Sequence, residues 1–145
     1  MRLVWVSDAF LAQVLYRMKA AMQRVGIPVL PRIAHRLAMM ISQVCIGDPV
    51  FVAAGVYIPH GQVVIDGFTE IHHGVVLFPW VTIGLRAGNF RGPVVRPHAH
   101  IGSGAKVIGP VTIGNRAKVG ANAVVVDDVA GHVTVVGVPA QRVAT

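Results

Sequence analysis

The stretch that decides the fold is residues 101–125, IGSGAKVIGPVTIGNRAKVGANAVV, in which an aliphatic residue stands at every sixth position. The same spacing extends back to Ile46, with a one-residue slip after Ile58 and a break after Ile83. This large aliphatic series comprises Ile46, Val52, Ile58, Ile65, Ile71, Leu77, Ile83, Val95, Ile101, Val107, Ile113, Val119 and Val125. A helix repeats about every 3.6 residues and an open sheet about every two, so this period predicts a solenoid of short stacked units.

A second, smaller series stands four residues after the members of the first. Its members are Val50, Val56, Thr69, Val75, Val81, Ala87, Ala99, Ala105, Val111, Ala117, Ala123 and Val129, and only Gln62 breaks it. Each hexad predicts a short strand and a tight turn, and three hexads make one coil of about eighteen residues, with strands about 4.8 Å apart. We therefore expect an all-β fold, a left-handed parallel β-helix of hexapeptide repeats. The alternative, an antiparallel sandwich, would not keep a six-residue register for so long.

Residues 1–45 lack the hexads and form an N-terminal helical segment. A first amphipathic helix is predicted over residues 9–25, with Arg17, Lys19 and Arg24 on its polar side, and a second from near Pro31. The apolar faces are Phe10, Leu11, Val14, Leu15, Met18 and Met22 on the first helix, and Ile33, Ala34, Leu37, Ala38 and Ile41 on the second. We expect these helices to cover the open end of the solenoid. The alternative is peripheral contact with a membrane through residues 1–25.

The remaining boundaries follow from the hexads. We expect the β-helix at residues 46–130, an extruded loop at residues 84–94, and a C-terminal tail at residues 131–145. Residues 1–20 are not a convincing signal peptide, because Asp8 and Gln13 interrupt the apolar run and no cleavage pattern follows.

The chain has 13 Lys and Arg against 6 Asp and Glu, a net charge of +7 that favours an anionic partner. We exclude nucleic acid, because the cations form no single run and aromatic residues are few. The mean hydropathy of +0.63 is high, but no apolar run reaches the roughly eighteen residues of a spanning helix. We assign the surplus apolar surface to burial between subunits. The single cysteine, Cys45, leaves no disulfide framework and fits a reducing cytoplasm.

The stretch from Gly102 to Val143, GSGAKVIGPVTIGNRAKVGANAVVVDDVAGHVTVVGVPAQRV, resembles the C-terminal coils of the hexapeptide-repeat acyltransferases. Within that superfamily it is most similar to the serine O-acetyltransferase branch, as is the segment PRIAHRL at residues 31–37. The resemblance covers residues 31–143 and implies a cytoplasmic enzyme, at the inner face of the membrane if the helices touch lipid. It also implies acetyl-CoA as acyl donor, a phosphate-bearing partner suited to a basic chain, and no metal.

The resemblance matches His60, in the segment YIPHGQVVI, to the general base that deprotonates the acceptor hydroxyl. Such a base needs a pKa near neutrality and hydrogen-bond reach of the hydroxyl. The aspartate that accompanies this histidine in the branch aligns with Pro59, so another group must orient the ring, and Asp66 and Asp48 are the nearest acids. No nucleophile stands beside a base, and Cys45 belongs to the helical end, so we expect direct acyl transfer.

Two further departures concern the acceptor. The second histidine of the branch aligns with Gly92, and the acidic residue that holds the serine amino group aligns with Cys45. An amino acid needs a fixed anion for its ammonium group, and that half of the site is missing. The loss resembles the acetyltransferases of polysaccharide biosynthesis, of the colanic acid type. We therefore expect the hydroxyl of a sugar or glycan precursor as acceptor, with serine as the alternative.

The loop GLRAGNFRGPV, residues 84–94, interrupts the hexads. We expect it to wrap the active site of a neighbouring subunit, with Arg86, Asn89 and Arg91 toward cofactor phosphates or an anionic acceptor. The resemblance lays the pantetheine arm of coenzyme A along small residues one coil apart. The cofactor-binding positions are then Gly84, Ser103, Gly104, Ala105, Ala121, Pro139 and Arg142.

Apolar residues left over on the outside of the prism predict self-association. They are Val76, Phe78, Trp80, Val124 and Val126. We expect a homotrimer with active sites in its three clefts.

Two other classes of function remain open. The γ-class carbonic anhydrases hold zinc with three histidines on this fold, and His73, His98 and His100 approach that set, although their spacing differs in detail. His72 would point away from His73. A non-catalytic coil that only assembles a complex is the other alternative, supported by the missing aspartate and second histidine.

Overall fold

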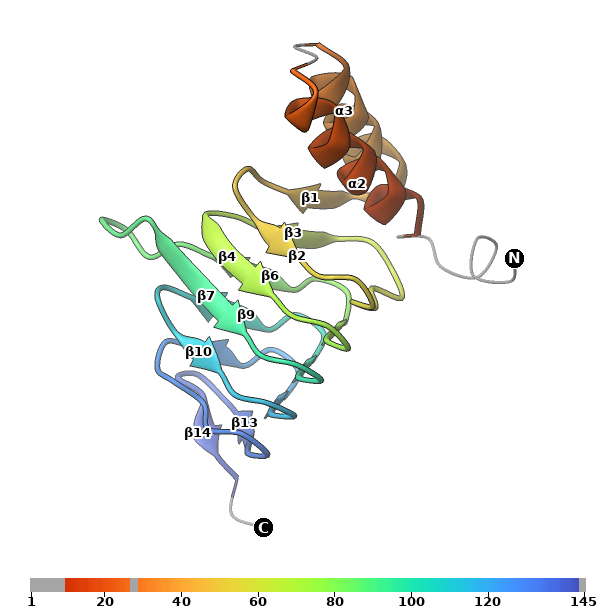
Figure 1. Ribbon diagram of the computed structural model, residues 1–145. Helices are drawn as coiled ribbons and strands as arrows, with labels where there is room; N and C mark the ends of the chain where they lie inside the picture. The colour runs from red at the N-terminus through yellow and green to blue at the C-terminus, as the bar shows by residue number, and fades with distance from the viewer. Residues whose placement is uncertain (1–9, 27–28, 144–145) are drawn as a thin grey trace.

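A computed structural model of the chain describes residues 10–26 and 29–143 (Figure 1). Two helices, α2 (Phe10–Arg24) and α3 (Leu30–Ser42), pack side by side across one end of a stack of short strands. Among the described residues, no helix is both long and apolar enough to cross a membrane.

The strands form three flat faces of a prism. The first face holds β1 (Val44–Ile46), β3 (Val63–Ile65), β6 (Thr82–Gly84), β9 (Lys106–Ile108) and β12 (Val124–Val125). The second face holds β2 (Phe51–Val52), β4 (Phe68–Ile71), β7 (Arg91–Val95) and β10 (Thr112–Ile113). The third face holds β5 (Val76–Leu77), β8 (His100–Ile101), β11 (Lys118–Val119), β13 (Thr134–Val136) and β14 (Gln141–Arg142). Every pair is parallel except β13 with β14.

The large aliphatic series forms the core. On the first face Ile65 stacks on Ile83, Ile83 on Val107, and Val107 on Val125, and every member of the series is buried. Burying one such side chain completely contributes about 1.5–3 kcal/mol. The predicted left-handed parallel β-helix is confirmed.

Every member of the smaller series is buried except Ala87. Ala87 is exposed, so its predicted core position is wrong, because the chain has left the prism there. Gln62 has a positive φ of 62°. The next residue, Val63, is fully buried and fills the core position that the spacing assigned to Gln62. The extra residue at the slip is thus absorbed in the turn before β3.

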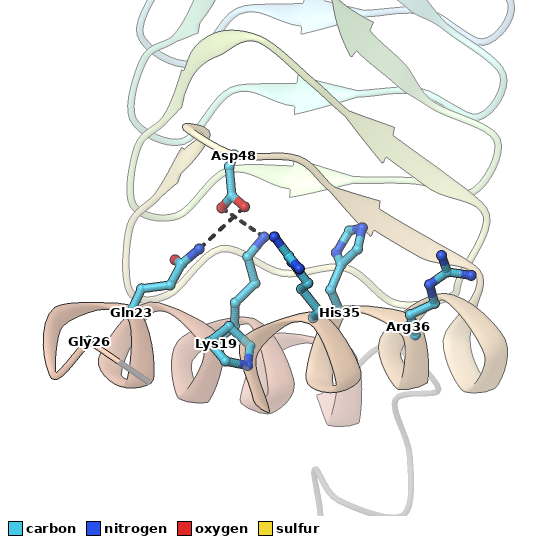
Figure 2. A pocket seen from close by; sticks show the side chains of 8 residues that line it. Lys19, Gln23, Gly26, His35, Arg36 and Asp48 are labelled. Atoms are coloured by element: carbon cyan, nitrogen blue, oxygen red, sulfur yellow. Dashed lines mark hydrogen bonds and ion pairs between the residues drawn. The ribbon is translucent and has the colours of Figure 1, made fainter. Parts of the chain in front are cut away.

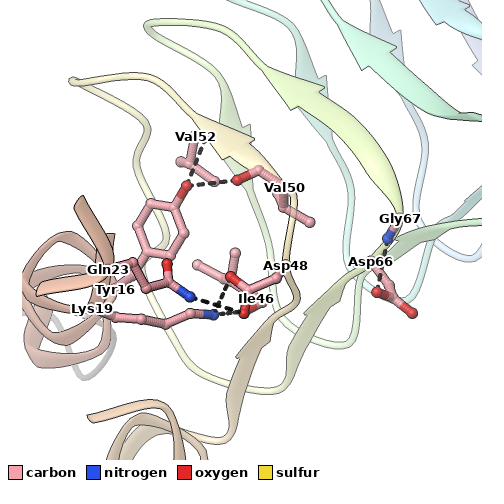
Figure 3. Close-up of polar contacts among 9 residues, drawn as sticks. All are labelled: Tyr16, Lys19, Gln23, Ile46, Asp48, Val50, Val52, Asp66 and Gly67. Atoms are coloured by element: carbon pink, nitrogen blue, oxygen red, sulfur yellow. Dashed lines mark hydrogen bonds and ion pairs between the residues drawn. The ribbon is translucent and has the colours of Figure 1, made fainter. Parts of the chain in front are cut away.

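The helices pack on the first coil through polar contacts that the sequence did not reveal (Figure 3). The Tyr16 hydroxyl donates to the carbonyl of Val50 at 2.7 Å. The Lys19 ammonium lies 2.8 Å from Asp48 and 3.4 Å from the Ile46 carbonyl oxygen. Lys19 is only 4% exposed, so its predicted place on the polar side of the helix is wrong. The amine is buried because Asp48 pairs with it.

The buried face of α3 also differs from the predicted stripe. Small residues pack against α2 and the first coil, namely Pro31, Ala34, Ala38 and Ser42. The larger residues of the stripe are exposed, Ile33 by 51%, Leu37 by 41% and Ile41 by 58%. Their predicted burial is wrong for a single chain, because close helix packing here selects small side chains.

The ends of the prism extend beyond the expected limits. Strand β1 already begins at Val44, and β13 stacks in parallel on β11, with Val119 opposite Val135. Residues 131–145 were expected to be a tail, but those described complete another rung and close with the antiparallel strand β14. The extruded loop is shorter than expected, because Gly84 ends β6 and Arg91 begins β7.

Candidate active site

The turns between the faces align into three corners along the prism. The His60 corner joins the third face to the first, at residues 59–62, 78–81, 102–105, 120–123 and 137–140. The loop corner joins the first face to the second, at residues 47–50, 66–67, 85–90, 109–111 and 126–128. The basic corner joins the second face to the third, at residues 53–55, 72–75, 96–99, 114–117 and 130–133.

His60 lies at the top of its corner, where the prism meets the end of α3. Its side chain is exposed. A Cβ atom at the next residue, Gly61, would collide with the carbonyl oxygen of Ser42, the last residue of α3. Only glycine allows this approach, so the helix end fixes the backbone that carries His60. The imidazole is therefore exposed on a turn that packs against the end of α3.

Small residues continue the same corner below His60. The Gly104 N–H donates to the Pro79 carbonyl at 2.9 Å, and the Asn122 N–H donates to the Ser103 carbonyl at 2.8 Å. A Cβ atom at Gly102 would lie 2.7 Å from the nitrogen of Ala121, so no side chain fits at this position. Ser103 and Ala121 lie two and three rungs from His60, about 10 and 14 Å at the strand spacing.

The proposed cofactor residues do not all share this corner. Ser103, Gly104, Ala121 and Pro139 lie on it, whereas the Ala105 side chain is fully buried in the core and offers only its backbone. The other two lie elsewhere. Gly84 ends β6 at the loop corner, where its carbonyl accepts from the Gly109 N–H at 2.9 Å, and Arg142 lies on β14 at the C-terminal end. A shallow hollow of about 300 Å³ adjoins Arg142 and contains Asp127 and Asp128.

The extruded loop projects from the loop corner between β6 and β7 (Figure 1). Arg86 and Asn89 are exposed on it, and Arg91 is exposed where β7 begins. The Asn89 side-chain oxygen accepts from the Arg91 N–H at 2.9 Å, and the Asn89 N–H donates to the Arg86 carbonyl at 3.0 Å. Asn89 therefore shapes the loop, and both arginines beside it are exposed.

One chain does not bring His60 and the loop together. His60 precedes β3 and the loop follows β6, and these neighbouring strands run parallel with Ile65 opposite Ile83. The two features thus lie at opposite ends of the first face. Six residues of strand span about 20 Å. A site that uses both features requires two copies of the chain.

Neither acid expected to orient His60 lies beside it. Asp48 and Asp66 both follow strands of the first face and lie at the loop corner. Asp48 pairs with Lys19, and Asp66 accepts from the Gly67 N–H at 2.8 Å. Their predicted role is therefore wrong within one chain, because both carboxylates are at the far end of the face.

Cys45 is half-buried in β1, on the first face. Burial raises the pKa of its thiol above the usual value, the Asp66 carboxylate raises it further, and Lys19 opposes them. A thiol with a raised pKa is a poor nucleophile near neutral pH.

The histidines considered as metal ligands lie on the basic corner or just beyond it. The rings of His73 and His98 meet edge to face, with centroids 5.1 Å apart, and His100 follows on β8. Arg96 and Arg116 are exposed on the same corner. Among the described residues no group of three His, Cys, Asp or Glu side chains is placed to hold a metal ion.

The comparisons with known proteins identify the family. The model of the bacterial transferase hexapeptide family (six repeats) matches residues 92–127. The serine acetyltransferase of Helicobacter pylori is 34% identical over 88% of this chain and 77% of its own length. That of Mycobacterium tuberculosis is 39% identical over 80% of this chain and 52% of its own. The chain belongs to the hexapeptide-repeat transferase family, and these relatives within it are serine acetyltransferases.

Solved structures agree with this assignment. The serine acetyltransferase of Neisseria gonorrhoeae in complex with serine has a TM-score of 0.88 and 27% identity, covering 98% of this chain and 59% of that one. A serine acetyltransferase in complex with CoA has a TM-score of 0.83 and 28% identity, covering 91% of this chain and 55% of that one. The chain spans about half the length of the Mycobacterium relative. The predicted likeness to serine acetyltransferases is confirmed, and these relatives do not support the finer likeness to polysaccharide enzymes.

Proposed function

We propose that the protein transfers an acetyl group from acetyl-CoA to a hydroxyl, and that serine is its acceptor. Family membership and the serine acetyltransferase relatives support both parts. The observation that carries the proposal is the His60 corner. It combines an exposed imidazole with a column of turns built from small residues, where a side chain at Gly102 would collide with the backbone of the next coil. A thin pantetheine arm needs such a column, and its thioester then ends near the base.

In the proposed reaction His60 takes the proton of the acceptor hydroxyl while the oxygen attacks the thioester carbonyl. The new carbon–oxygen bond forms as the carbon–sulfur bond breaks, and the departing sulfur receives the proton from His60. Backbone N–H groups near the loop of a neighbouring copy would stabilise the charge on the carbonyl oxygen. Cys45 takes no part, since burial and Asp66 raise the pKa of its thiol.

A homotrimer completes the proposed site. Trp80 is 61% exposed, Phe78 39% and Val126 37%, and these side chains lie on or beside the first face. Burying them between copies would bring one copy's loop toward another's His60, which a single chain keeps apart. Arg86 and Arg91 would then reach the cofactor phosphates or the carboxylate of the acceptor. The domain limits that we propose are a helical segment that ends with α3 at Ser42 and a β-helix with its loop that begins with β1 at Val44.

A sugar or glycan precursor is the second candidate acceptor, and two positions favour it. Cys45 offers no anion to an ammonium group. A side chain cannot stand at Gly92, because its Cβ atom would collide with the Thr69 hydroxyl and lie 3.2 Å from the Phe68 carbonyl. The loop histidine of the serine enzymes therefore has no place at this position. A polysaccharide precursor made in the cytoplasm has a hydroxyl but needs no ammonium site, which agrees with the residues at Cys45 and Gly92.

The test is an acceptor panel of serine, sugar nucleotides and lipid-linked glycans, with acetyl-CoA as donor and detection of the free thiol. Removing a general base typically costs about 10²–10⁴-fold in rate. His60→Ala should therefore lose about that much turnover with its coenzyme A affinity unchanged, while Cys45→Ala stays active. Turnover of serine alone supports the first acceptor, and turnover of a sugar alone supports the second. Near-normal turnover in His60→Ala would overturn the assignment of the base.

A further inference from the structure

A hollow of about 610 Å³ lies between the two helices and the first turn of the prism (Figure 2). Its charged lining consists of Lys19 from α2, Arg32 and Arg36 from α3, and Asp48 from the turn after β1. His35 lies between the two arginines in sequence and lines it as well. The hollow opens beside the loop corner, away from His60, and its volume lies in the range of small-molecule sites.

The charges of this hollow do not balance. Lys19 is 4% exposed and pairs with Asp48 at 2.8 Å, and Gln23 donates to the other oxygen of Asp48 at 3.3 Å. No other carboxylate lines the hollow among the described residues. The single anion is therefore committed to the buried ammonium, which leaves Arg32 and Arg36 without a compensating carboxylate in the lining. Because these two are four residues apart on a helix, they project from one side of it.

The pKa of His35 reflects first its burial and then the charges around it. Burial lowers the pKa of His35 below its usual value, Lys19 lowers it further, and Arg36 adds a smaller effect in the same direction. Asp48 is the group that opposes them. The surroundings of His35 on α2, on α3 and on the first turn therefore disfavour a further positive charge. A bound anion would reverse this balance.

We propose that the hollow is a binding site for a small dianion, with Arg32 and Arg36 pairing with its oxygens and His35 donating a further hydrogen bond when protonated. The ligand class is a phosphate monoester, because guanidinium groups match phosphate oxygens in pairs. The volume leaves room for a small organic group on the phosphate. The site is separate from acetyl transfer at the His60 corner, so its failure would leave the proposed enzyme activity intact.

The proposal predicts the direction of a pH effect. His35 has a lowered pKa in the folded protein, so protonating it costs stability as the pH falls below its unfolded value near 6.5. A dianion favours the protonated ring and raises this pKa. Sulfate should therefore stabilise the protein more near pH 6 than near pH 8. Because the charge of sulfate is the same at both pH values, the difference would come from the protein.

The test is an NMR pH titration of histidine-labelled protein, in sodium sulfate and in sodium chloride of equal ionic strength. Sulfate should raise the pKa of His35 and leave the other histidines unmoved. The double variant Arg32→Gln/Arg36→Gln should lose this rise and bind sulfate at least about tenfold more weakly, since one bond to a charged group contributes about 1.5–3 kcal/mol. The control Arg86→Gln/Arg91→Gln removes the same charge from the loop and should keep the rise. An equal rise in both double variants, or none in the unaltered protein, would refute the site.

A second pair of measurements identifies the source of the phosphate. Glycerol 3-phosphate in solution should reproduce the sulfate effect on His35 if the ligand is a free phosphate ester. Co-sedimentation with vesicles that contain phosphatidic acid, whose headgroup is a phosphate monoester, lost on changing Arg32 and Arg36, would assign the phosphate to a lipid headgroup. Both outcomes support a phosphate site. Failure of both probes, together with failure of sulfate, would overturn it.

Discussion

The substitution Gly61→Ala tests whether the end of α3 positions His60. The added Cβ atom would collide with the Ser42 carbonyl oxygen, a backbone atom that cannot rotate away. Gly61 does not have a positive φ, so the effect is steric alone. Relief requires that the helix or the turn shift, and such overpacking typically costs about 1–3 kcal/mol. At about 2–4 °C per kcal/mol for a chain of this size, Tm should fall by about 2–12 °C.

The functional consequence concerns the neighbouring imidazole. A displacement of about 1 Å in a catalytic group can cost about 10²-fold, so turnover should fall by that order. Binding of coenzyme A to the proposed column, lower on the corner, should change little. The control for stability is Gly84→Ala, where a Cβ atom meets nothing within 4 Å. Thermal melting at one protein concentration measures the change in Tm. Enzyme assays measure turnover, and calorimetric titration measures coenzyme A affinity. If Gly61→Ala has the same Tm as Gly84→Ala and keeps its turnover, the end of α3 does not position His60.

Four further outcomes are expected. Ala121→Trp should weaken coenzyme A binding by at least about tenfold in calorimetry by filling the column, whereas Asn115→Trp, exposed on the basic corner, should not. Ile83→Ala should lower the free energy of unfolding by about 2–5 kcal/mol in urea, since the side chain is fully buried. Lys19→Met should raise the pKa of His35 in an NMR titration, because Lys19 lowers it, and an unchanged value would contradict that cause. Light scattering should give the mass of a trimer, and a monomer at micromolar concentration would refute the shared site.

The repeat could be predicted because each of its positions is determined by its own coil. The inward position of each hexad must be aliphatic, whatever the rest of the chain does. Ile101 and Val107 can therefore be recognised as core residues from the sequence alone. The sequence-based prediction of buried positions fails where the chain leaves the repeat. Ala87 has the right spacing but lies in the excursion, and a count of residues cannot show that the backbone has left the prism.

The helical segment was harder to predict, because two packed helices choose their buried faces jointly. Periodicity placed Lys19 on the solvent side of the first helix, but the amine is buried because Asp48, 29 positions later, meets it at the first turn. Ile33 and Leu37 follow the apolar spacing and are nevertheless exposed. No local pattern contains the distant carboxylate or the close helix contact that decides these positions. The basic hollow depends on the same contacts and was missed for the same reason.

The two sites proposed here share one structural element. The N-terminal half of α3 carries Arg32 and His35 to the hollow, and its last residue, Ser42, fixes the glycine beside His60. A helix of 13 residues is about 20 Å long, so the sites do not touch. A rigid shift of α3 would still alter both sites. The sulfate titration of His35 should therefore be repeated in the Gly61→Ala variant. If the turn yields, His35 should respond to sulfate as in the unaltered protein. If the whole helix moves, the response should change together with turnover.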